Sequence, residues 1–303
     1  MTLPRPMLAS NQVVEDLDSI QYPVIASAKL DGWRSYNALG VPRTRKGLPI
    51  PNQFTRAMLS QPEFDGLDGE LICGSPTDPN AMQKAQSAFS SHGGKPAFTW
   101  YIFDDWRRGI NPYYEWWTDK LHNRNLPDFC QVLPQQYITS AADLEQFTAE
   151  VLNMGYEGVV TRHPTSPYKG YDGRANRSTR KQEWMLKVKP YTYEEGVIVG
   201  FKEKEHNLNA ATSDDLGFTK RSHHQAGKVG ADTLGSFILH SPNYPTNFKV
   251  GCGHLDDATK QLIWDTRKER LGQTVTFRSF KQTGIVNLPR QAQFVSFRAK
   301  EDM

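Results

Sequence analysis

The stretch SAKLDGWR (27–34) places a lysine, an aspartate, a glycine and an arginine close together in an otherwise strand-forming pattern. The residues YPVIASAK (22–29) have the β-branched and apolar content of a strand, and WRSYNAL (33–39) alternates well enough to form its partner. The Asp-Gly pair at 31–32 is typical of a tight hairpin turn. We therefore expect Lys29 at the end of a strand, beside this turn, with its side chain presented to a cleft.

The length and composition are those of a folded chain. With 303 residues the chain can bury a sizeable core or form two domains, and 38% hydrophobic with 23% charged residues argue against disorder. No apolar run approaches the roughly 20 residues that a membrane helix needs, and the start MTLPRPMLAS lacks the apolar core of a signal peptide. We expect a cytoplasmic protein, in the host cytoplasm if it is viral, with no membrane partner.

Three cysteines, Cys73, Cys130 and Cys252, are far apart and form no CxxC pair. We interpret them as free thiols of a reducing compartment. Cys252 lies two residues before His254, but no second pair of ligands has zinc-site spacing, so this triplet is interpreted as an ordinary loop.

Positive charge is concentrated in two regions. The net charge is only +3, but residues 161–190 contain eight Lys/Arg against two Asp/Glu, and residues 260–303 contain nine against four. Such regions suit a polyanion such as nucleic acid or a nucleotide. Charge alone is equally compatible with a solvated surface.

Strand and helix patterns mix without a regular βαβ repeat in the first part of the chain, which predicts an α+β fold. Further strands are expected at 66–73, 98–106, 156–160 and 184–189. One helix is expected to start at Pro79 after a cap at Thr77 or Asp78. A second, SAADLEQFTAEVLNMG (140–155), has a serine cap and a terminal glycine.

A change of pattern after Pro190 predicts a second domain. About five short strands and one helical segment (254–272) follow, which is typical of a small β-barrel of the oligonucleotide/oligosaccharide-binding (OB) type. The polar stretch 202–228 is expected to be a loose insertion loop between two barrel strands. The predicted domains are therefore 1–190 and 191–303.

Several short charged pieces lie on or beside the predicted strands: KLDGWR (29–34), DGE (68–70), FD (103–104), EGVV (157–160) and LKVKP (186–190). Lys187 and Lys189 are two apart on a strand, so both point to one face and favour an anion between them. Glu70 and Glu157 suit a divalent metal or sugar hydroxyls, and Phe103 offers a flat face to a base. Together the pieces describe a nucleoside triphosphate site, although the chain has no GxxxxGK[ST] P-loop.

Each piece also has a plainer interpretation. Lys29 and Asp31 can form a surface ion pair, Glu157 can be a solvated strand end, and Phe103 taken alone fits a core position better. The set as a whole is harder to explain as ordinary surface, because several charged strand ends must then coincide. The binding site is therefore the preferred interpretation.

The same pieces, in the same order, resemble the motifs of the covalent nucleotidyltransferases, namely the ATP-dependent DNA ligases and the mRNA capping enzymes. KLDGWR resembles motif I, RTRKG (43–47) the basic motif that follows it, LDGEL motif III, YIFDD motif IIIa, EGVV motif IV and LKVKP motif V. NFKVGCGHLDD (247–257) and FVSFRAKED (294–302) resemble segments of ligase barrel domains, and PMLA (6–9) recurs ahead of motif I in ligases. The resemblance covers nearly the whole chain and is greatest, in size and layout, to the small phage-type DNA ligases.

This resemblance implies a nucleotidyltransferase domain of antiparallel sheets with flanking helices, followed by an OB-fold domain. It also implies that Lys29 attacks the α-phosphate of ATP and holds AMP as a phosphoramidate. AMP then passes to the 5′-phosphate of a nick in double-stranded DNA, and the 3′-hydroxyl displaces it. A lysine is mostly protonated at neutral pH, and nearby Lys187, Lys189 and Mg²⁺ would favour its neutral, nucleophilic form.

The resemblance also implies a role for each motif residue. Lys187 and Lys189 would grip the α-phosphate, and Phe103 would stack on adenine. Arg298, and with it Lys300, would orient the leaving pyrophosphate when the barrel domain closes. The other implied contacts are those of Arg34 and Arg45 with the AMP ribose or nick phosphate, of Glu70 with the ribose or metal, and of Glu157 with Mg²⁺ or Mn²⁺.

Two positions depart from the family pattern. Ser27 stands where many relatives carry a glutamate that helps to read the adenine, and the ending RAKE replaces Arg-x-Asp-Lys, which affects Lys300. The implied partner is nicked double-stranded DNA of replication, repair or recombination, and the implied state is a monomer. Two alternatives stay open: an RNA ligase or capping-type nucleotidyltransferase, and a catalytically inactive nick-binding protein.

Overall fold

The structure is a computed structural model that describes residues 2–121, 124–213, 219–280 and 287–298. These residues form two compact units, and the chain passes from one to the other between Lys189 and Pro190. No helix in this described part of the chain is both long and apolar enough to span a membrane.

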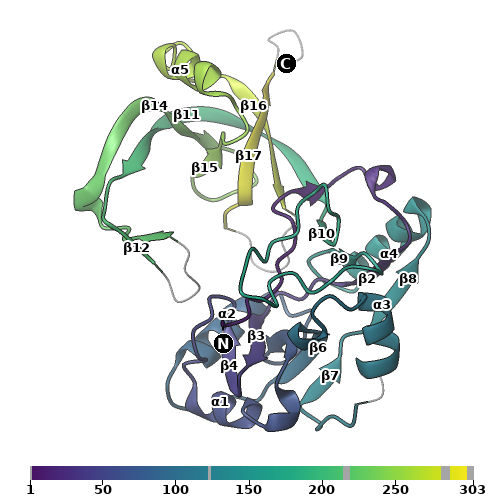
Figure 1. Ribbon diagram of the computed structural model, residues 1–303. Coiled ribbons are helices and arrows are strands. Elements are labelled where there is room, and N and C mark those ends of the chain that lie inside the picture. The colour runs from purple at the N-terminus through teal and green to yellow at the C-terminus, as the bar shows by residue number, and fades with distance from the viewer. Residues whose placement is uncertain (1, 122–123, 214–218, 281–286, 299–303) are drawn as a thin grey trace. The chain divides into compact units, whose positions relative to one another are not determined.

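The first unit contains two five-stranded sheets (Figure 1). The first sheet has the order β1-β10-β9-β2-β8, with strands β1 (Val13–Val14), β2 (Val24–Ala28), β8 (Gln135–Ile138), β9 (Val159–Arg162) and β10 (Met185–Val188). The second has the order β4-β3-β5-β6-β7, with strands β3 (Trp33–Ala38), β4 (Val41–Thr44), β5 (Leu67–Ile72), β6 (Thr99–Asp105) and β7 (Cys130–Val132). Each predicted antiparallel sheet is in fact mixed, because β1 and β7 add as parallel edge strands.

Helices fill the connections of this unit. The α-helices are α1 (Gln53–Leu59), α2 (Ala81–Ser90), α3 (Tyr113–Trp116) and α4 (Ala141–Asn153), and the short helical turns are η1 (Leu17–Ser19), η2 (Pro62–Phe64), η3 (Trp106–Arg108) and η4 (Trp117–Leu121). The prediction for α4 is confirmed: the Ser140 hydroxyl accepts a hydrogen bond from the Asp143 amide at 3.2 Å. The prediction for α2 is wrong at its start, since the helix begins at Ala81 with Asn80 at the capping position.

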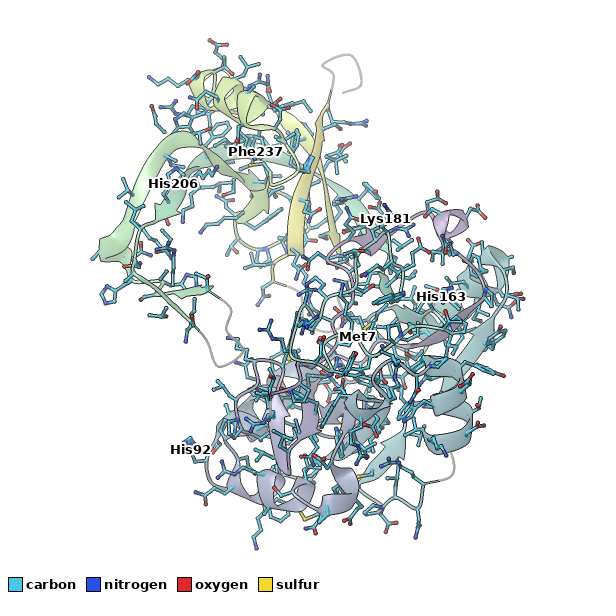
Figure 2. All side chains as sticks on the ribbon, in the orientation of Figure 1. Met7, His92, His163, Lys181, His206 and Phe237 are labelled. Carbon is cyan, nitrogen blue, oxygen red and sulfur yellow. The ribbon has the colours of Figure 1, made fainter. Side chains whose placement is uncertain are left out.

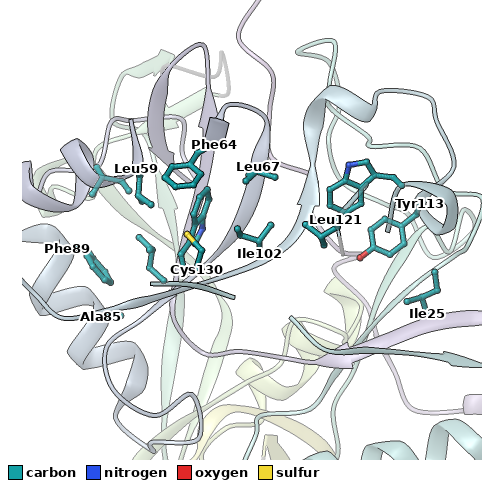
Figure 3. Packing of buried hydrophobic residues seen from close by; sticks show 14 residues of the cluster. Ile25, Leu59, Phe64, Leu67, Ala85, Phe89, Ile102, Tyr113, Leu121 and Cys130 are labelled. Carbon is teal, nitrogen blue, oxygen red and sulfur yellow. The ribbon is translucent and has the colours of Figure 1, made fainter. Parts of the chain in front are cut away.

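Side-chain alternation along β2 separates two apolar clusters. Val24 and Ala26 point to one face and pack with residues of α4. Ile25 points to the opposite face and packs with Tyr113 and the core of the second sheet, as Figure 3 shows. By the same alternation, the side chains of Ser27 and Lys29 lie on the same face as that of Ile25. This face is directed toward the second sheet.

The predicted hairpin at residues 31–32 is wrong. Strand β2 pairs with β8 and β9, whereas β3 pairs with β4 and β5, so the chain crosses from one sheet to the other between them. A Cβ on Gly32 would lie 2.4 Å from the Ile72 side chain and 2.5 Å from the Leu71 carbonyl oxygen. Glycine is therefore required here by the close approach of another strand, and not by a turn.

The second unit is a closed barrel with the strand order β11-β14-β15-β17-β16. Its strands are β11 (Tyr191–Asn207), β14 (Lys228–His240), β15 (Phe248–Gly251), β16 (Thr274–Phe280) and β17 (Arg290–Phe297). Phe237, labelled in Figure 2, is fully buried and stacks on Phe294 with ring centroids 4.8 Å apart. Helix α5 (Asp257–Asp265) contacts β14 and is shorter than the predicted segment 254–272.

The expectation of a loose loop at 202–228 is also wrong. Strand β11 continues to Asn207 and pairs with the start of β14, and β12 (Ala211–Ser213) pairs with β13 (Thr219–Arg221) before the short turn η5 (Gln225–Gly227). Glu205 lies 3.6 Å from both Lys202 and Lys228, so opposite charges accompany the strand pairing. Within its described residues, the backbone of this stretch is paired at 202–207, 211–213 and 219–221.

Candidate active site

Lys29 lies directly after β2, where the segment that leads into β9 holds its backbone. Its amide donates to the Gly158 carbonyl oxygen at 2.8 Å, next to the start of β9. Gly158 has φ +152°, and a Cβ there would lie 2.5 Å from the Val188 carbonyl oxygen, so only glycine allows this approach. The Lys29 ammonium forms an ion pair with Glu157, and its side chain is 22% exposed. The lysine is therefore held at a strand end and shielded from bulk solvent.

Glu157 joins Lys29 to Lys189. One carboxylate oxygen contacts the Lys29 ammonium and the other contacts the Lys189 ammonium, which arrives from the end of β10. Burial opposes the charged carboxylate, but the two ammonium groups outweigh it and hold the pKa of Glu157 at about 2. Glu157 is therefore ionised at neutral pH and fixes both lysines.

Further cations gather around this pair. Lys187 lies on β10, and its pKa is lowered by burial and by the charges of Arg177, Lys29 and Arg45. Burial and the charges of Arg34 and Arg177 likewise lower the pKa of Arg45. A cluster of positive groups whose charges disfavour one another gains stability from a bound polyanion such as a polyphosphate.

The second sheet contributes Arg34, Asp68 and Glu70. Arg34 on β3 pairs with Glu70 on β5 in the strand register, and Asp68, two residues before Glu70, shares their face. Two nitrogens of Arg34 donate to the two oxygens of Asp68, each at 2.6 Å. The guanidinium also lies 4.5 Å from the centroid of the Phe103 ring on β6. Arg34, whose side chain is 13% exposed, is thereby fixed against the aromatic ring.

The carboxyl group of Glu70 is partly buried, and burial raises its pKa to about 7 while Arg34 and Lys29 oppose the rise. A carboxyl group with this pKa is present in both protonation states at neutral pH. It can therefore either donate a hydrogen bond to a sugar hydroxyl or accept one from it.

Met7 of the N-terminal segment and Tyr168 form hydrogen bonds with Arg34, with its partner Asp68 and with each other. The Tyr168 hydroxyl donates to Asp68 at 2.5 Å and accepts from the Met7 amide at 3.1 Å, and the Met7 carbonyl oxygen accepts from Arg34 at 3.2 Å. Met7, labelled in Figure 2, is fully buried. The PMLA segment thus has a structural task, which is to complete the hydrogen bonds around Arg34.

The structure brings together most of the predicted residues in the first unit. They are Lys29, Arg34, Arg45, Glu70, Phe103, Glu157, Lys187 and Lys189, which its two sheets supply. Arg298 lies in the second unit, after β17, where it forms an ion pair with Glu195 at 2.7 Å. Lys300 lies outside the described residues.

Sequence reasoning did not single out Asp68 or Arg177. Asp68 is the second residue of the LDGEL motif, and its spacing of two from Glu70 could have placed it on the same face. Arg177 lies in the basic region 161–190, and no individual role is predicted for it. Its guanidinium donates to the Ala9 carbonyl oxygen at 2.8 Å, a contact that joins segments too distant in sequence for any local pattern to reveal.

Metal ligands were expected at Glu157 and Glu70. Among the residues that the structure describes, no group of three or more His, Cys, Asp or Glu side chains is arranged to hold a metal ion. The two carboxylates nevertheless fit Mg²⁺, which prefers oxygen ligands and commonly takes only one or two carboxylates beside substrate phosphates.

The two sheets of the first unit and the closed barrel, joined in one chain, are similar in fold to solved structures of DNA ligases. A crystal structure of Chlorella virus DNA ligase-adenylate matches with a TM-score of 0.52 and 24% identity, covering 99% of each chain. A structure of a Lig E DNA ligase matches with a TM-score of 0.62 and 20% identity, covering 97% of this chain and 99% of that one. In sequence, no family model and no curated protein matches. The chain thus has the fold of the DNA ligases, the family that its motifs resemble.

Proposed function

We propose that this protein is an ATP-dependent DNA ligase that seals nicks with 5′-phosphate and 3′-hydroxyl ends. The observation that carries the proposal is Lys29, held by Glu157 among cationic groups in a chain with a ligase fold. In this proposal the first unit is the adenylation domain, and the barrel is the OB-fold domain of nucleic-acid binding.

The first step forms a bond between Lys29 Nζ and the α-phosphorus of ATP and breaks the bond to the leaving pyrophosphate. Lys29 forms an ion pair with Glu157, so its ammonium group must give a proton to water at its partly exposed end before the amine attacks. A carboxylate with a pKa of about 2 is a poor proton acceptor, so Glu157 orients the amine and does not deprotonate it.

The remaining residues of the site stabilise the negative charge of the phosphate groups. Lys187, Lys189 and Arg177 stabilise the charge on the transferring phosphoryl group. Glu157 and Glu70 would hold Mg²⁺, which supplies further stabilisation of phosphate charge when it is bound. The adenylyl group then passes from Lys29 to the 5′-phosphate, and attack by the 3′-hydroxyl releases AMP and joins the strand.

The proposal is tested by following two products from one preparation. The protein is incubated with labelled ATP or GTP and Mg²⁺, and then with nicked DNA or nicked RNA duplexes. We expect a covalent AMP adduct and sealed DNA from ATP. Labelling by GTP alone would indicate a capping-type enzyme, sealing of RNA alone an RNA ligase, and DNA binding without labelling an inactive nick-binding protein.

Two variants separate the lysine's chemistry from its charge. Lys29→Arg keeps the positive charge beside Glu157 but removes the nucleophilic amine, so adduct formation and sealing should fall below detection. Lys84→Arg, on the exposed face of α2, should leave both products unchanged. Sealing of a nick by the Lys29→Arg variant with ATP would rule out this lysine as the nucleophile.

A further inference from the structure

The edge of β8 places an amide side chain beside the candidate nucleophile. Gln135, the first residue of β8, pairs directly with Ser27 of β2 in the antiparallel register. Directly opposed residues project to the same face of a sheet. Lys29 lies two residues beyond Ser27, about 7 Å along the strand, and shares that face. Gln135 is therefore near the candidate site, although sequence reasoning assigned it no role.

The aromatic residue of the site and Gln135 share a hydrogen-bond partner. The register between β5 and β6 shifts from Asp68–Asp104 to Gly69–Ile102, which leaves Phe103 as the extra residue of a bulge. The Tyr113 hydroxyl lies 2.7 Å from the Phe103 carbonyl oxygen and 2.7 Å from the Gln135 amide oxygen. Tyr113 thus connects the backbone of Phe103 to the amide of Gln135.

One proton must serve both contacts of Tyr113. Burial raises the pKa of Tyr113, so its hydroxyl keeps the proton. The Phe103 carbonyl oxygen can only accept, and it therefore receives that proton. The Tyr113 hydroxyl oxygen can then form a hydrogen bond with Gln135 only if the Gln135 amide nitrogen donates to it. This requires a rotation of the amide by 180°, which exchanges the positions of its oxygen and nitrogen.

The other end of the amide has no partner. The Gln135 atom that points away from Tyr113 is buried and forms no hydrogen bond with any residue that the structure describes. After the half turn this atom is the amide oxygen, which is a hydrogen-bond acceptor. A buried acceptor without a donor is unfavourable, and a ligand that brings a donor removes the penalty.

We propose that Gln135 is the residue that selects adenine, and that its amide oxygen accepts a hydrogen bond from the 6-amino group of the base. Adenine carries a donor at this position and guanine carries the acceptor O6. A guanine base would place two acceptors against each other. Tyr113 is the positioning residue, because it prevents the amide from turning to present its nitrogen. This inference rests on the proposed function, since it assumes that ATP is the nucleotide.

The test compares the rates of covalent labelling of the whole chain by ATP and by GTP. We expect the wild-type protein to prefer ATP, and Gln135→Leu to lower kcat/KM for ATP about 10- to 100-fold, so that the ATP:GTP ratio collapses. Gln135→Glu keeps an acceptor and should retain the preference. Tyr113→Phe frees the amide to turn and should raise labelling by GTP. Gln136→Leu, exposed on the same strand, is the matched control and should change neither rate.

The outcomes distinguish this inference from the proposed function. A wild-type protein that forms no adduct with either nucleotide overturns both. A wild-type protein that prefers ATP while the Gln135→Leu variant keeps the same ATP:GTP ratio overturns only the role of Gln135. Because the ratio is measured on protein that reacts, a variant with reduced stability still gives a decisive result, and Gln135→Glu gives an independent one.

Discussion

The surroundings of Glu157 lower the pKa of its carboxyl group, whereas the surroundings of Glu70 raise the pKa of its own. Glu157 lies between two ammonium groups and has a pKa of about 2, whereas burial raises the pKa of Glu70 to about 7. Two carboxyl groups in one site with such different pKa values suit different tasks. Glu157 suits permanent contact with cations. Glu70 suits exchange of hydrogen bonds with a sugar hydroxyl and, when it is ionised, can add an oxygen ligand to Mg²⁺.

The raised pKa of Glu70 has a consequence for stability. Between the ordinary pKa of 4.5 and about 7 the folded state binds this proton more tightly than the unfolded state, so the free energy of unfolding falls as pH rises through that window. Glu70→Gln removes this penalty. Relative to wild type, the variant should gain up to about 3 kcal/mol in free energy of unfolding between pH 4.5 and pH 8.

Urea unfolding of both proteins across that pH range measures this difference. Glu63→Gln, at an exposed position of η2, is the control and should follow the wild-type pH dependence. If the difference between the Glu70→Gln variant and wild type stays constant with pH, the environment assigned to Glu70 is incorrect.

The positions of strands and helices in the sequence were more predictable than the pairing of the strands. The strand containing residues 24–28 and helix α4 follow from local alternation and capping, which the sequence displays directly. The pairing of β2 was not predictable, because alternation reveals the period of a strand and not its neighbour. The Asp-Gly pair favoured a hairpin, and the tertiary approach of Leu71 and Ile72 to Gly32 decided otherwise.

The residues of the candidate site divide in the same way into those with a local signal in the sequence and those without one. Lys29, Glu157, Lys187 and Lys189 were predictable because each belongs to a short charged motif at a strand end, and the structure brings these four close together. Other residues act through contacts between distant segments. Asp68, Arg177 and Gln135 belong to this second group, and a single sequence contains no local signal for contacts of that kind.

The crossing between the two sheets gives a direct stability test. Gly32→Ala would place a methyl group within 2.5 Å of the backbone carbonyl oxygen of Leu71, so the strands must separate. We expect a loss of about 1–3 kcal/mol in free energy of unfolding, as for other overpacked sites. Gly253→Ala, where a Cβ meets nothing within 4 Å, is the control and should be nearly neutral. Equal stability of the two variants in urea unfolding would show that Gly32 is not at a close crossing.

Division of the chain into two units separates the proposed chemistry into two parts. The residues proposed to hold AMP lie in the first unit, and Arg298, proposed to orient the pyrophosphate, lies in the second. The adenylation step should therefore need both units. Sealing of a nick that already carries 5′-adenylate releases AMP and involves no pyrophosphate. This step should therefore depend much less on Arg298.

This division predicts a selective effect of Arg298→Ala. Formation of the AMP adduct from ATP should slow about 100-fold, as expected for loss of one group that stabilises transition-state charge. Sealing of a nick that already carries 5′-adenylate should change little. Lys249→Ala, exposed on β15, controls for the loss of one positive charge from the barrel. Equal slowing of both steps by Arg298→Ala would place Arg298 in DNA binding instead.

The most direct measurement of the proposed function is mass spectrometry of the whole chain after incubation with ATP and Mg²⁺, followed by peptide mapping. We expect a mass increase of one adenylyl group, carried by the peptide that contains Lys29 and absent from the Lys29→Arg variant. An unmodified wild-type chain, or an adenylyl group on another residue, would contradict it.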